Sequence, residues 1–151
     1  MRRAMSSKIV AIAHAEAIVD NASVTTTAVD TRGWNFAKIY VRLGTTDIAL
    51  TALKVQSSDA SGSGFADLDS LDMDGDTDID GSAASLPAAT DDDKYYIFLI
   101  DLRGKKRYLD LVATVGDGSA GGWLSAWCEL SQPDFGPNSA AEMGAAVALS
   151  G

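Results

Sequence analysis

The chain is poor in the residues that carry most catalytic and metal-binding chemistry. Its 151 residues include one cysteine, Cys128, and one histidine, His14. A single cysteine excludes an intrachain disulfide and a zinc site built from several cysteines. A single histidine leaves little material for a catalytic triad. The sequence also lacks the HExxH, Walker and GxSxG motifs. We therefore expect a protein that is not an enzyme.

Basic residues and long apolar runs are also scarce. Twelve Lys and Arg stand against 21 Asp and Glu, so the net charge is −9. This balance disfavours nucleic acid and anionic membranes as partners, because both are bound by positive patches. No uncharged run reaches the roughly 18 apolar residues of a membrane helix. Residues 1–19 resemble a signal peptide superficially, but His14 and Glu16 interrupt the apolar stretch. We expect a chain made in the host cytoplasm without a leader.

Hydrophobic residues are plentiful, at 46% of the chain, and most of them recur with a period of two. In residues 36–43 every second side chain is apolar, whereas Lys38 and Arg42 fall on the other side. The same alternation occurs in residues 51–56, 107–115 and 123–130. This pattern is typical of half-buried strands. The expected inward residues are Ala37, Ile39, Val41, Leu43, Leu53, Val55, Leu109, Leu111, Ala113, Val115, Leu124, Ala126, Cys128 and Leu130.

Three other segments are expected to be strands on weaker patterns. Residues 95–102 are apolar on both faces up to Asp101, which is typical of a central strand covered on both sides. Residues 8–19 place Ile9 and Ala11 on an apolar face, although their alanine content would also permit a helix. Residues 24–29 are rich in threonine. Together these patterns predict six or seven strands.

The strands and the short turns between them predict an all-β protein, an antiparallel β-sandwich with a jelly roll among its arrangements. Pro133 and Pro137 end the last strand, and Ser139 with Glu142 forms a capping box. The capping box predicts a short C-terminal helix, with an extended arm as the alternative. We expect one domain over residues 1–151, with an N-terminal arm at about 1–8, an acidic insert at about 59–93 and a C-terminal tail at about 133–151.

The acidic insert raises the question of calcium. Asp72, Asp74 and Asp76 have the spacing of the first three ligands of an EF-hand loop. The match then fails, since Thr77 occupies the glycine position and Ala83 the position of the bidentate glutamate. A solvated acidic loop without a cofactor is the favoured interpretation, and a calcium site at the three aspartates is the alternative.

Six residues are candidates for contact with another protein. Arg103, Lys105, Lys106 and Arg107 form the main basic cluster. The cluster is expected to be an exposed hairpin tip or a latch onto an acidic surface of a neighbouring copy, weakened by salt. Trp34 and Phe135 complete the set, since aromatic residues are enriched at interface hot spots, although core packing also explains a tryptophan. Cys128 is expected to be a buried, unreactive thiol.

Several segments resemble a group of small virion proteins of tailed bacteriophages. The resemblance lies in turn and strand patterns and covers roughly residues 20–142. Its segments are residues 29–37, 43–44, 50–59, 101–109, 116–121 and 137–142. It implies a capsid decoration or cement protein, a β-sandwich or jelly roll bound to the assembled major capsid protein.

The function expected from the resemblance is that of a virion structural protein on the capsid exterior. Such a protein bridges neighbouring subunits of the major capsid protein, and we expect a homo-oligomer. Two alternatives stay open at this point. One is a calcium-dependent carbohydrate-binding or adhesin-type β-sandwich module that uses the aspartates and tryptophans. The other is a head–tail connector or tail component.

Overall fold

The computed structural model describes residues 6–18, 21–24, 26–116, 121–137 and 139–149. These residues form eight strands and no helix, and hence contain no helix that could span a membrane. The strands are β1 (Ser7–Ile18), β2 (Val29–Asp30), β3 (Trp34–Thr46), β4 (Leu50–Ser58), β5 (Ala66–Asp72), β6 (Tyr95–Asp101), β7 (Tyr108–Val115) and β8 (Gly122–Pro133).

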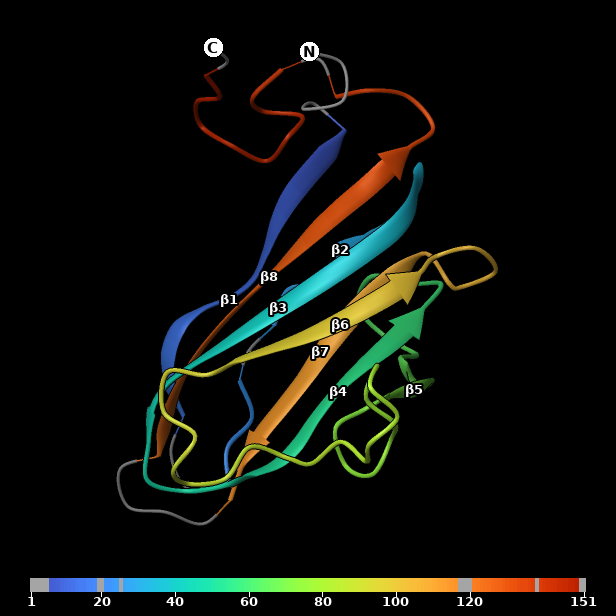
Figure 1. Ribbon diagram of the computed structural model, residues 1–151. Helices are drawn as coiled ribbons and strands as arrows, with labels where there is room; N and C mark the ends of the chain where they lie inside the picture. The colour runs from blue at the N-terminus through green and yellow to red at the C-terminus, as the bar shows by residue number, and fades with distance from the viewer. Residues whose placement is uncertain (1–5, 19–20, 25, 117–120, 138, 150–151) are drawn as a thin grey trace.

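The strands form two antiparallel sheets that pack face to face (Figure 1). The sheet orders are β1-β8-β3-β6 and β2-β7-β4-β5. The first strand pairs with the eighth, the second with the seventh, the third with the sixth and the fourth with the fifth. Such nested pairing is that of a hairpin rolled up on itself, which is the jelly roll. The expected β-sandwich is thus confirmed.

The core lies between the two sheets and consists of the alternating residues that the sequence predicts. Ala37, Ile39, Val41, Leu53 and Leu109 are each at 0% exposure. Every other expected inward residue of β3, β4, β7 and β8 is also buried. Period two therefore sets the register of these four strands, since a slip by one residue would expose a whole apolar face.

The expected apolar face of β1 is wrong at Ile9 and Ala11 and right at Ala13, and the side chains of residues 14–19 lie outside the described part of the chain. Ile9 is 51% exposed and Ala11 is exposed, whereas Ile12 and Ala13 are buried. The cause is a pair of register shifts in the β1–β8 ladder, on either side of Ala13. A β-bulge adds a residue to one strand and so changes which residues face inward. Strict alternation therefore fails in this strand.

The position expected for residues 95–102 is wrong as well. β6 pairs with β3 on one side and is an edge strand of its sheet. Phe98 and Ile100 are buried, but Tyr95, Ile97 and Leu99 are 58%, 47% and 44% exposed. A segment that is apolar on both faces thus has one face uncovered in the protomer.

The expected C-terminal helix does not form. The capping bond is present, since the Glu142 amide donates to Ser139 Oγ over 3.3 Å, and the Met143 amide donates to the Ser139 carbonyl. The turn ends at Gly144, whose φ is +76°. A left-handed glycine is a common helix terminator, and one turn is too short to persist as a helix. The tail instead contacts β1, where the Ile9 amide donates to the Met143 carbonyl over 2.8 Å.

The acidic insert forms a strand, whereas the threonine-rich segment mostly does not. Within residues 59–93 the chain forms β5, and Leu68, Leu71 and Met73 pack against the core. Ile79, by contrast, is 90% exposed. Of the described residues in 24–29, which leave out residue 25, only Val29 belongs to a strand, together with Asp30.

Candidate functional site

Exposed apolar side chains gather on the outer face of the β1-β8-β3-β6 sheet. Among the described residues, five of the nine large hydrophobic side chains that are exposed lie here, and the other four lie in the insert and the tail. We call this surface the aromatic face and define it by Ile9, Tyr40, Tyr95, Ile97, Leu99, Trp123 and Trp127. Large exposed apolar patches on soluble proteins mark interaction surfaces.

The centre of the aromatic face is a stacked pair of rings. Tyr40 and Trp127 are cross-strand neighbours, and their ring centroids lie 5.3 Å apart with planes inclined by 14°. Tyr95 meets the Trp127 ring edge-on, with centroids 6.5 Å apart. The Tyr40 hydroxyl donates to Glu129 over 3.3 Å. These contacts hold three large rings in fixed positions on rigid strands, so little side-chain entropy remains to be lost on binding.

Trp123 extends the aromatic face to the N-terminal end of β8. Its side chain is 49% exposed. A Cβ atom at Gly44 would lie 3.0 Å from the Trp123 Cβ, so the glycine lets the two strands approach at this point.

The outer face of the other sheet is polar by comparison. Asp67 accepts hydrogen bonds from Lys54 and Gln56, and Asp110 accepts one from Thr26. Pairing with Asp67 raises the pKa of Lys54, and the same contact lowers the pKa of Asp67. Within the described residues, this face exposes no large hydrophobic side chain. The sandwich therefore has one face suited to a partner and one suited to water.

The six predicted contact residues meet at one end of the sandwich. Trp34 begins β3, residues 103–107 connect β6 to β7, and Phe135 follows β8. Three main-chain hydrogen bonds join these segments: Leu102 to Asn35 over 3.0 Å, Thr31 to Arg107 over 3.0 Å, and Asp134 to Gly33 over 2.9 Å. We call this region the basic end.

Local pairing neutralises half of the basic cluster. Arg103 contacts Asp101 at 2.5 Å, and this hydrogen bond lowers the pKa of Asp101 to about 2. Arg107 contacts Asp30 at 2.6 Å and lowers the pKa of that carboxyl as well. Lys105 and Lys106 are exposed and make no ion pair within the described part of the chain. Both lysines are therefore cations at this end that a partner could engage.

Trp34 and Phe135 differ in their surroundings although they share a hollow. The hollow has a volume of about 310 Å³ and also involves Lys8 and Glu142. Trp34 is half-buried and packs against the core, whereas Phe135 is 92% exposed. Of these two predicted contact residues, Phe135 is the one that the fold leaves uncovered.

Two of the three aspartates of the calcium hypothesis, Asp72 and Asp76, accept main-chain amides of their own loop. Asp76 accepts the Asp72 amide over 2.8 Å, and Asp72 accepts the Asp74 amide over 2.9 Å. The described residues contain no group of three or more His, Cys, Asp or Glu side chains arranged to hold a metal ion. The carboxylates therefore stabilise a tight turn, as aspartates commonly do.

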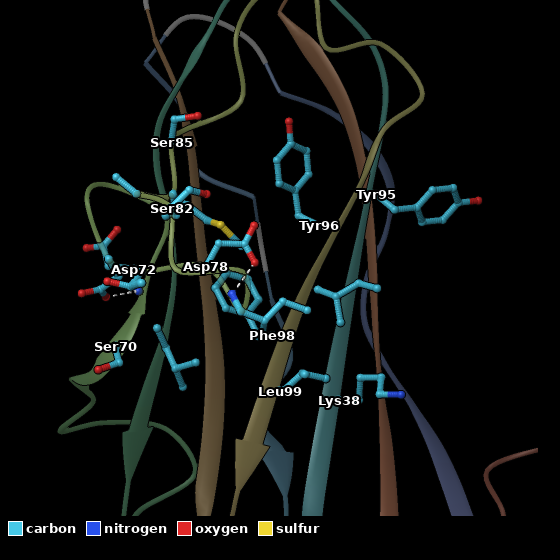
Figure 2. Close-up of a pocket in the computed structure, with 18 residues that line it drawn as sticks. Lys38, Ser70, Asp72, Asp78, Ser82, Ser85, Tyr95, Tyr96, Phe98 and Leu99 are labelled. Atoms are coloured by element: carbon cyan, nitrogen blue, oxygen red, sulfur yellow. Dashed lines mark hydrogen bonds between the residues drawn. The ribbon is translucent and has the colours of Figure 1, made fainter.

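A larger hollow of about 730 Å³ lies along β6, between this strand and residues 70–85. Tyr96 and Phe98 occupy its side nearest the core, and Asp72, Asp78 and Ser82 lie across from them (Figure 2). Leu99 and Lys38 lie on the other side of β6 in the same view. Burial, with a hydrogen bond to Asp91, raises the pKa of Tyr96 to about 12. The free side of β6 thus borders an open, partly apolar space.

Cys128 is fully buried in β8, as expected. Burial raises the pKa of its thiol to about 12, which leaves almost no thiolate near neutral pH.

No protein-family model, no curated protein sequence and no solved structure matches this chain. The candidate site therefore depends on its geometry alone. The sequence singles out the residues that meet at the basic end, but the aromatic face as a surface is not among its predictions. A usable signal was present: Tyr40, Tyr95 and Trp127 occupy outward positions of alternating strands, where polar residues are the rule.

Proposed function

We propose that this chain is a non-enzymatic virion structural protein that decorates and cements the capsid of a tailed phage. The observation that carries the proposal is the concentration of exposed apolar side chains on a single sheet face. Its three central rings are prearranged, and aromatic residues of this kind dominate the binding energy of protein interfaces. The resemblance to phage virion proteins supplies the partner, the assembled major capsid protein.

The mechanism follows from linkage and copy number. A protein that binds only the assembled shell stabilises that state by its binding free energy. Each protomer offers the aromatic face to the shell surface, and its polar opposite face stays in water. Many symmetric copies bound to one particle turn a modest affinity into high avidity. The surplus of negative charge, −9, keeps the free protein soluble before assembly.

The test is co-sedimentation of the purified chain with empty heads built from the major capsid protein of the phage that carries the gene. We expect saturable binding at hundreds of copies per particle. A dozen copies would indicate a connector, and no binding would contradict the proposal.

Paired substitutions locate the contact. Trp123→Asp places a charge on the aromatic face and is expected to weaken binding to heads by roughly a hundredfold, as loss of a hot-spot residue does. Thr51→Asp is the matched control, since Thr51 is an exposed strand residue of the other sheet. Equal binding by both variants would place the contact elsewhere.

A further inference from the structure

β6 differs from the other three edge strands of the sandwich, because each of those is protected against pairing. β1 is bulged, and its Ile9 amide donates to the Met143 carbonyl of the tail. β2 has two residues. β5 carries Asp67 and Asp69, and its Ser70 has a φ of +64°. Bulges, short length and charge are the common means by which proteins prevent strand addition at a sheet edge.

β6 is neither bulged nor short, and its one charged residue is the last, Asp101. Its pairing with β3 runs without a register shift from Phe36↔Asp101 to Arg42↔Tyr95. The five residues 95–99 carry no charge, no proline and no glycine. A straight, apolar edge strand is a template for pairing with another strand.

The outward main-chain groups of β6 can be identified from the ladder. The Leu43 amide donates to the Lys94 carbonyl, and the Leu102 amide donates to the Asn35 carbonyl. Since residues of an antiparallel strand alternately face and turn from their partner, the even-numbered residues of β6 face β3. Tyr95, Ile97 and Leu99 therefore turn their N–H and C=O groups toward the free edge. Within the described residues, no hydrogen bond satisfies them.

The same three residues expose their side chains on the aromatic face, at 58%, 47% and 44%. The amino-acid pattern of the strand is that of a central strand, covered on both faces and paired on both edges. The protomer leaves the outer face of β6 uncovered, and the free edge has no paired strand and borders the open hollow between β6 and residues 70–85. A second strand beside β6 would satisfy the main chain and cover the side chains together.

The charges on either side of β6 indicate which strand could pair with its free edge. The segment before β6 contains Asp92, which makes no ion pair within the described residues. The segment after β6 contains Lys105 and Lys106, which are also without an ion-pair partner there. The acidic and basic ends thus lie at opposite ends of one strand. An antiparallel copy of the same strand brings unlike ends together, whereas a parallel copy would bring like ends together.

We propose that β6 pairs antiparallel with β6 of a second copy, around a two-fold axis near Ile97. The two four-stranded sheets then form one continuous sheet of eight strands, as strand addition requires. Tyr95 of each copy lies opposite Leu99 of the other, and Lys105 and Lys106 lie against the partner's Asp92. The dimer also joins two aromatic faces into one, although the pairing itself does not depend on the capsid.

The experiment is sedimentation equilibrium of the purified full chain, without capsid protein. The wild type is expected to be a dimer. Ile97→Pro removes an N–H that the protomer does not use but the pairing needs, and Ile97→Lys places a charge at the axis. Both are expected to weaken dimerisation by roughly a hundredfold while the circular dichroism spectrum stays that of a β-protein. Ala11→Lys, at the opposite edge of the same face, is the matched control and is expected to leave the dimer intact.

Two further measurements complete the test. Lys105→Glu combined with Lys106→Glu is expected to weaken the dimer roughly tenfold at low salt, and high salt should remove the difference. Hydrogen exchange of the wild type needs no variant: the Tyr95, Ile97 and Leu99 amides should become more protected as protein concentration rises. A monomeric wild type, a dimer unaffected by both Ile97 variants, or protection of these amides only on capsid shells overturns the proposal. Failure to bind capsids leaves the dimer, and so this inference, unaffected.

Discussion

At the scale of single residues, Gly144 holds the tail against the first strand. Its φ is +76°, and a Cβ atom there would lie 1.8 Å from the Ile9 carbonyl oxygen. Gly144→Ala must therefore displace the tail, because a left-handed alanine costs about 1–2 kcal/mol even without this clash. We expect the Ile9 amide, which donates to Met143, to exchange at least roughly tenfold faster, with little change in Tm. Unchanged exchange at Ile9 would mean that the tail does not dock there.

The Asp101 carboxylate gives a prediction about acid sensitivity. Arg103 lowers the pKa of Asp101 to about 2, from an ordinary value of 3.8. A carboxyl whose pKa is lower in the folded state stabilises the fold above its unfolded pKa, and this contribution disappears as the pH falls from about 4 toward 2. The Asp101 carboxyl, followed by NMR, should titrate near pH 2, and Arg103→Gln should move its midpoint up toward the ordinary value. A midpoint that does not respond to Arg103→Gln would show that another group causes the shift.

At the scale of strands, Ile39 and Ile97 form a matched pair for testing the sandwich. Ile39 is at 0% exposure in β3, and Ile97 is 47% exposed in the neighbouring β6. Ile39→Ala should lower the free energy of unfolding by about 3 kcal/mol, because it removes buried carbon and leaves a cavity. Ile97→Ala should cost less than about 1 kcal/mol in the monomer. Urea titrations at a concentration below dimerisation measure both, and equal losses would contradict the assigned faces.

The aspartate turn gives a prediction about metal removal. Since Asp72 and Asp76 accept main-chain amides of their own loop, the turn should form without a cation. Thermal melting with calcium and with EDTA should give the same Tm. A Tm that rises with calcium concentration would revive the calcium-dependent module as the function of the chain.

At this scale the sequence predicts the features that neighbouring residues determine and misses those that depend on pairing with distant strands. Alternation in β3 and β7 predicted the inward residues from Ala37 to Val115, because period two reports burial directly. The face of β1 was missed, because the bulges near Ala13 arise from pairing with a distant strand. The prediction of a C-terminal helix is right about its capping bond, from the Glu142 amide to Ser139, but wrong about the helix, because Gly144 ends the chain's helical turn after one turn. The pattern of β6 predicts a central strand, which is wrong for the protomer, because β6 lies at the edge of its sheet with its outer side chains exposed.

At the scale of the whole molecule, the jelly-roll pairing places the N-terminal strand beside the C-terminal one. Ser7 pairs with Ser131, and Val29 pairs with Leu109, so most ladders join residues far apart in sequence. No local pattern encodes such pairing. The same topology brings Trp34, residues 103–107 and Phe135 to one end, although they are separated along the chain. The residues of the basic end were therefore predictable from the sequence, but their proximity in the folded chain was not.

The reactivity of Cys128 can be used to measure global unfolding of the protein. It lies in the middle of β8, between β1 and β3, where it pairs with Val10 and Ile39. Its thiol is fully buried, and burial raises its pKa to about 12, so a thiol reagent needs both exposure and deprotonation. We expect Cys128 in water to be labelled only through the small equilibrium population of globally unfolded molecules. Ile39→Ala should raise that population, and with it the labelling rate, roughly a hundredfold, in proportion to the lost stability. The control is a denatured sample, in which labelling should be immediate. Labelling that is fast in the wild type and unchanged by Ile39→Ala would mean that β1 separates from β8 locally, and that the two sheets do not open as one unit.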